Sequence, residues 1–77
     1  MFNTSNLYLA AYLYALDESA FTGTEAGSDA FSQFIFKSKI QSKDTTDIEK
    51  EYWNNGGMIA PKKYANAIRS LKERIKN

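Results

Sequence analysis

The sequence predicts a small α+β domain over residues 1–77, with the order helix, strand, strand, helix, short strand, helix. Residues 61–75 repeat apolar side chains at helical spacing, and residues 31–37 alternate as a pleated strand does. With 77 residues the chain has room for one core. We expect the first and third helices to cover one face of a small antiparallel sheet.

The first helix is predicted over Leu7–Leu16, a run of Leu, Ala and Tyr that contains the strong helix formers Leu and Ala. Thr4 or Ser5 is the expected N-cap, because either hydroxyl can accept a hydrogen bond from a free backbone N–H. The run is apolar on all sides, which predicts burial on two faces.

Part of this apolar surface is expected to contact a partner. Leu7, Ala11 and Tyr14 are the proposed second face of the helix, and exposed patches of this kind usually mark interfaces. Trp53, beside Tyr52, is the other candidate, since exposed aromatic side chains anchor partners or stack on bases. The sequence thus favours self-association or a protein partner, although aromatic side chains also close the cores of small domains.

Two strands follow the first helix. Ala20–Glu25 is a weak strand because Gly23 interrupts it, and residues 26–29 have turn chemistry. Phe31–Lys37 is stronger, with Phe34 and Phe36 on one side. The two segments predict an antiparallel hairpin.

Ser42–Asp47 holds several candidates for the N-cap of the second helix, and among them the spacing of Thr46 to Glu49 matches a capping box. Gly56–Gly57 should end this helix, since glycine adopts the left-handed cap conformation readily. Met58–Ala60 is expected to be a short extended strand before Pro61, which suits the first position of the last helix.

The last helix has the clearest apolar stripe, and beside it lies a row of cations. The stripe residues are Tyr64, Ala67, Ile68, Leu71 and Ile75. The cations Lys62, Arg69, Lys72 and Lys76 fall within an arc of about 80° at helical spacing, a ridge that suits phosphate contacts. The same cations also suit a solvated helix face, a protein partner, or stabilisation of the helix C-terminus.

The distribution of charge favours an anionic partner for the second half of the chain. The net charge is +1, but residues 1–36 carry four acids and no base, whereas residues 37–77 carry ten bases and five acids. A basic terminal segment of this kind suggests binding to nucleic acid or to an acidic protein surface.

The composition excludes several kinds of active site. The chain has no Cys and no His, so disulfides, thiolate or imidazole metal ligands, and nucleophile–His triads are impossible. The remaining candidates are carboxylates at expected turns and helix starts, where acids complement the helix dipole; they are Asp17, Glu18, Asp44, Asp47, Glu49 and Glu51. We therefore expect a protein that is not an enzyme, with no catalytic residue, metal or cofactor.

The apolar run of residues 7–16 predicts neither a signal peptide nor membrane association. No base precedes the run, and it is shorter than the roughly 20 residues of a membrane-spanning helix.

Four segments in this order resemble a small uncharacterised domain family of phages, mobile elements and bacteria: residues 7–13 (LYLAAYL), 34–36 (FIF), 51–56 (EYWNNG) and 61–72 (PKKYANAIRSLK). The chain departs from the family pattern between Asp17 and Asp29, where the expected hairpin is rich in glycine and acids. The resemblance implies a small α+β domain from a phage or mobile element. Because no signal peptide is predicted, we expect the protein in the host cytoplasm or the virion. The resemblance implies no catalytic residues.

Together these observations predict a non-enzymatic interaction module that binds nucleic acid or a host or phage protein. The alternative is a virion-associated or other assembly component that packs through its first helix.

Overall fold

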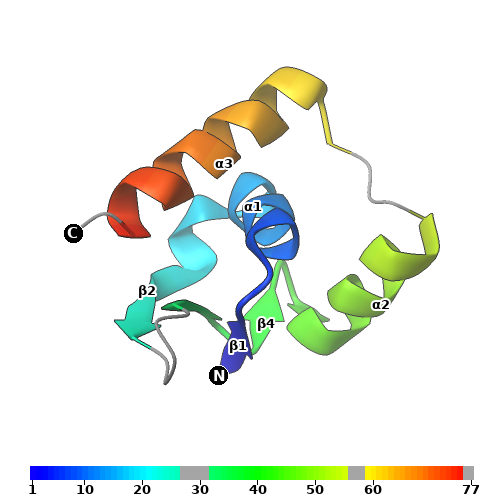
Figure 1. The fold of residues 1–77 in the computed structure, drawn as a ribbon. Helices are drawn as coiled ribbons and strands as arrows, with labels where there is room; N and C mark the ends of the chain where they lie inside the picture. Colours follow the sequence, from blue (N-terminus) through cyan, green and yellow to red (C-terminus); the bar gives the residue numbers. More distant parts are fainter. Residues whose placement is uncertain (27–31, 56–58, 76–77) are drawn as a thin grey trace.

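Helix α1 (Leu7–Leu16) lies at the centre of the fold, between a β-sheet and helix α3 (Pro61–Ile75), as Figure 1 shows. This computed structural model describes residues 1–26, 32–55 and 59–75. The other elements are β1 (Phe2–Thr4), η1 (Glu18–Ala20), β2 (Phe21–Ala26), β3 (Ser32–Phe36), β4 (Lys39–Ile40), β5 (Lys43–Asp44) and α2 (Thr45–Asn55). The predicted α+β class is confirmed.

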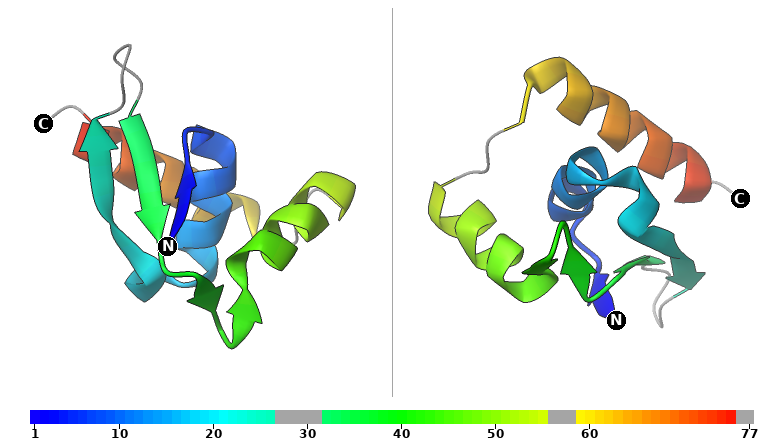
Figure 2. Two further views of the ribbon diagram at one scale, coloured as in Figure 1. Left: turned by 90° about the horizontal axis from the view of Figure 1, so that it is seen from below. Right: turned by 180° about the vertical axis from the view of Figure 1, so that it is seen from behind.

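The main sheet is antiparallel and has the strand order β1-β3-β2, so that β3 lies in the middle (Figure 2, left). The predicted β2–β3 hairpin is confirmed, with Thr24 paired to Phe34. Gly23 marks a register shift in this pairing and has a φ of +146°, a conformation that glycine adopts readily. The glycine that weakens the strand pattern therefore forms a β-bulge.

Strand β1 has no counterpart in the sequence prediction. It pairs with β3 through Phe2 and Phe36, and its three residues are too few to show an alternating pattern. The N-cap of α1 is Asn6, so the prediction of Thr4 or Ser5 is wrong. Asn6 Oδ1 accepts hydrogen bonds from the backbone N–H groups of Tyr8 and Leu9 at 2.9 and 3.1 Å.

A tight turn at Gln41 and Ser42 joins β4 to β5, a second small ladder that the sequence pattern does not predict. Both residues have positive φ, 54° and 66°, which is costly for side chains other than glycine. The Gln41 side-chain amide donates to the carbonyl oxygen of Leu16 at 3.0 Å. The turn therefore satisfies a backbone acceptor at the end of α1.

Helix α2 begins at Thr45, so Thr46 is its second residue, and the predicted N-cap at Thr46 is wrong. Thr45 is fully buried, and its hydroxyl donates to the carbonyl oxygen of Lys37 at 2.7 Å. Ile59 and Ala60 belong to no strand, so the predicted short strand is wrong for these two residues. Residues 56–58, which include the predicted glycine stop, lie outside the described part of the chain.

Helices α1 and α3 lie on the same side of the sheet, but in two layers: α1 packs between the sheet and α3 (Figures 1 and 2). The expectation that the first and third helices cover one face of the sheet is confirmed, with α1 as the inner layer. The apolar circumference of α1 explains the two layers, because a helix without a polar face needs cover on opposite sides. Fully buried residues come from all three layers, among them Leu9, Ala10, Ala11, Leu13, Phe36 and Leu71.

Among the described residues, no helix combines the length and the hydropathy that a bilayer crossing requires.

The packing of α3 on α1 predicts a large effect of Leu71→Ala. Leu71 is fully buried, and replacing such a leucine with alanine costs roughly 2–5 kcal/mol. Urea or thermal unfolding measures the loss, with the exposed neighbour Lys72→Ala as control, expected within about 0.5 kcal/mol of wild type. Equal stability of the two variants would contradict the position of α3.

Candidate functional site

The outer face of α3 presents cations to solvent. Lys62, Arg69 and Lys72 are all exposed, while Ala67 and Leu71 on the opposite side of the helix are buried. Figure 1 shows α3 as the outer layer over α1. The structure thus brings three of the four predicted phosphate-contacting residues onto one exposed helix. Lys76, the fourth, lies outside the described residues.

No ion pair engages these three side chains within the described part of the chain, where the one ion pair joins Lys43 and Glu51. Glu73, also exposed, is the one acid of α3. Lys72 stands in the last turn of the helix, where a cation complements the helix dipole. Lys62 is in the first turn, where the helix dipole disfavours a cation. Stabilisation of the helix dipole therefore does not explain why all three cations lie on this face.

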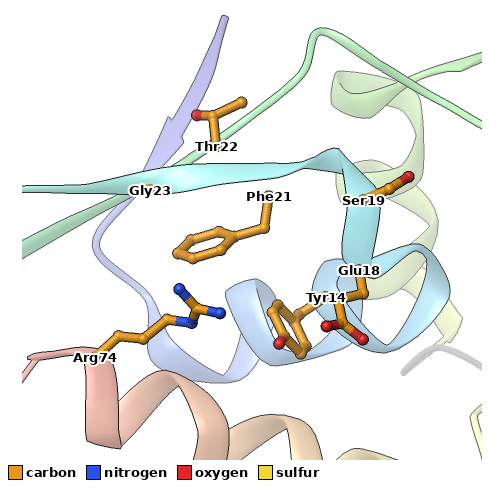
Figure 3. Close-up of a pocket in the computed structure, with 7 residues that line it drawn as sticks. All are labelled: Tyr14, Glu18, Ser19, Phe21, Thr22, Gly23 and Arg74. Atoms are coloured by element: carbon orange, nitrogen blue, oxygen red, sulfur yellow. The ribbon is translucent and has the colours of Figure 1, made fainter.

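A surface hollow of about 450 Å³ lies at the C-terminal end of α3. Figure 3 shows its lining residues, which come from α1, η1, β2 and α3: Tyr14, Glu18, Ser19, Phe21, Thr22, Gly23 and Arg74. The guanidinium carbon of Arg74 lies 5.2 Å from the centroid of the Phe21 ring, a cation–π contact. Tyr14 meets Phe21 edge-on, with ring centroids 5.7 Å apart.

A second hollow adjoins the first through Tyr14 and Glu18, which line both. On the α3 side it is bounded by Lys63, Asn66 and Ser70. Lys63, Ser70 and Arg74 are spaced at helical intervals on one flank of α3. The two hollows therefore follow this flank of α3.

The four predicted partner-interface residues do not form one surface. Ala11 is fully buried inside the chain's own core, so its assignment to a partner interface is wrong. Leu7 is half-buried against the same core, and Tyr14 lines the hollow beside Arg74. Trp53 is 59% exposed, and its ring meets that of Tyr52 at 5.1 Å. The apolar surface that predicts self-association through α1 is thus largely covered by α3 and the sheet.

The carboxylates have structural or exposed positions in the described residues. Asp17 caps η1: its Oδ1 accepts from the backbone N–H and the hydroxyl of Ser19 at 3.0 and 2.6 Å. Asp47 lies in the first turn of α2, and Glu51 pairs with Lys43. In the described ranges no three carboxylates come together as a metal site would require.

A cluster of tyrosines attaches α3 to the other two helices. The Tyr64 hydroxyl donates to the carbonyl oxygen of Tyr8 at 3.0 Å and lies 3.4 Å from the Tyr52 hydroxyl. Burial, and next the adjacent Tyr52 hydroxyl, raises the pKa of Tyr64 above the ordinary tyrosine value. These contacts fix the N-terminal part of α3 and hence the direction of its outer face.

Sequence reasoning does not find the hollow. Glu18 and Arg74 are 56 positions apart and stand on different elements, so no local spacing links them. The faint signal in the sequence is Arg74, a cation that helical spacing places on the other flank of the apolar stripe from Lys62, Arg69 and Lys72.

No family model, curated protein sequence or solved structure matches this chain.

The raised pKa of Tyr64 predicts a pH-dependent contribution to stability. The fold favours the neutral phenol, so this contribution is complete below the unfolded tyrosine pKa of about 10 and is lost as the pH rises above it. Tyr64→Phe cannot ionise there. We expect the difference in unfolding free energy between wild type and Tyr64→Phe to shrink between about pH 9 and pH 11, measured by urea unfolding. A difference that stays constant would contradict the hydrogen bond and the partial burial of the Tyr64 phenol.

Proposed function

We propose that this domain is a non-enzymatic module that binds the phosphates of nucleic acid along the outer face of α3. The observation that supports the proposal most directly is the exposure of Lys62, Arg69 and Lys72 on one helix, with no ion pair to any described acid. Cations of this kind gain affinity by releasing counterions from the phosphate backbone.

The geometry of α3 supports contact with several phosphates. Lys62 and Lys72 are ten residues apart, which corresponds to about 15 Å along a helix. The apolar stripe of the helix is occupied by α1, so the cationic side is free to face a ligand. Because one arginine and two lysines contact backbone charge rather than base edges, sequence preference from this face should be slight.

The other candidate functions have less support. The second apolar face of the first helix predicts assembly through that helix, but Ala11 of this face is buried. Trp53 stays a candidate anchor for a protein partner. An origin in a phage or mobile element stays a prediction of the sequence resemblance.

The proposal predicts steep salt dependence that depends on α3. The triple variant Lys62→Gln, Arg69→Gln, Lys72→Gln removes three phosphate contacts. The slope of log affinity against log salt should become less steep by about 2.7 on duplex DNA and about 2.1 on single strands. Fluorescence anisotropy with labelled DNA at several salt concentrations measures both slopes.

The matched control is Lys37→Gln, Lys39→Gln, Lys50→Gln, which removes the same charge from exposed positions outside α3. It should leave the slope close to that of wild type. An equal loss in both triple variants would mean that net charge alone drives binding. Absence of wild-type binding at about 100 μM protein, the weak end of non-specific affinity, would remove nucleic acid as the ligand.

A further inference from the structure

The hollow beside the end of α3 contains two opposite charges that do not pair. Glu18 and Arg74 both line it (Figure 3), yet they form no ion pair within 4 Å. In the described part of the chain the one ion pair joins Lys43 and Glu51. Tyr14 lies between Glu18 and Arg74 in Figure 3, so a ligand that contacts both charges has to lie against the Tyr14 side chain. Such a ligand needs a donor edge for the carboxylate and an acceptor edge for the guanidinium.

The serine and threonine hydroxyls of the hollow are already engaged. The Ser19 hydroxyl donates to Asp17 Oδ1 at 2.6 Å, and the Thr22 hydroxyl donates to the carbonyl oxygen of Ile35 at 2.9 Å. Both charged side chains are exposed residues, and neither takes part in a hydrogen bond in the described structure. Glu18 and Arg74 are thus the charged groups left to recognise a ligand, beside the hydroxyl of Tyr14.

The walls of the hollow suit a flat ligand. Tyr14 and Phe21 supply aromatic surface, and the guanidinium of Arg74 lies over the Phe21 ring at 5.2 Å from its centroid. Flat heterocycles stack both on aromatic rings and on guanidinium planes. Gly23 has no side chain at the rim of the hollow, and no other atom lies within 4 Å of the position that a Cβ would take there.

We infer that this hollow binds a guanine base of single-stranded nucleic acid, an inference that rests on the proposed function of α3. Guanine has two adjacent N–H donors, N1 and N2, which match the two oxygens of the Glu18 carboxylate. Its O6 and N7 acceptors match the guanidinium fork of Arg74. Adenine and cytosine lack the pair of adjacent ring and amino donors.

The position of the hollow is consistent with a strand bound along α3. Arg74 and Lys72 are two residues apart near the C-terminal end of α3, so their side chains leave different sides of the helix. A strand whose phosphates contact Arg69 and Lys72 therefore has to turn past this end of the helix to place one unstacked base beside Arg74. In a duplex this base edge is paired and unavailable, so the pocket acts on single strands.

The test compares two labelled single strands of about eight nucleotides, within the usual site size for single-strand binding. One strand is all thymine, and the other has one central guanine. Anisotropy titrations of wild type should show tighter binding of the guanine strand by roughly 5- to 150-fold, the discrimination expected of a bidentate base contact. Glu18→Gln should reduce this preference to near unity while the all-thymine strand still binds.

Two further variants separate base recognition from charge. Glu25→Gln makes the same charge change at an exposed position of β2 outside the hollow and should keep the preference. Arg74→Lys keeps the charge but loses the planar fork, so the preference should fall while the salt slope stays.

Equal wild-type binding of the two strands would overturn the base pocket and leave the proposed function intact. The same holds if Glu18→Gln and Glu25→Gln reduce the preference equally. If neither strand binds, the pocket is wrong, and if duplex DNA also fails to bind, the proposed function is wrong as well.

Discussion

The burial of α1 on opposite sides is the constraint on which the rest of the structure depends. Leu9, Ala10, Ala11 and Leu13 are at most 1% exposed, so the helix needs the sheet on one side and α3 on the other. Covering apolar area at roughly 25 cal/mol per Å² is the main favourable term in a chain without disulfides. This packing uses the apolar stripe of α3 and turns its cations outward. The charged outer face is therefore a consequence of the need to cover α1.

Much of the fold follows from local patterns. The bounds of α1 and α3 and the β2–β3 pairing agree with the sequence because apolar spacing and Pro61 are strong local signals. Strand β1 and the β4–β5 turn escape prediction for a physical reason. Phe2 lies in a strand because it pairs with Phe36. Gln41 has a left-handed backbone conformation, and its side-chain amide donates to the carbonyl oxygen of Leu16. Both depend on partners far away in sequence.

The candidate site divides in the same way. The outward direction of Lys62, Arg69 and Lys72 could be predicted, because helical spacing alone separates them from the apolar stripe. The error at Ala11 has a clear cause: the pattern shows that the second face of α1 needs cover, but it does not show that α3 of the same chain supplies it. The hollow between Glu18 and Arg74 could not be predicted at all, since it exists only where η1, β2 and the end of α3 meet.

The most direct test of the central claim, that packing on α1 leaves the outer face of α3 free to bind nucleic acid, is a nuclear magnetic resonance titration with a guanine-containing single strand. The account predicts that backbone amide shifts concentrate at Lys62, Arg69 and Lys72 and around Glu18 and Arg74, while the buried amides of α1 change little. Shifts centred on Trp53 and α2, or spread evenly over the surface, would contradict it.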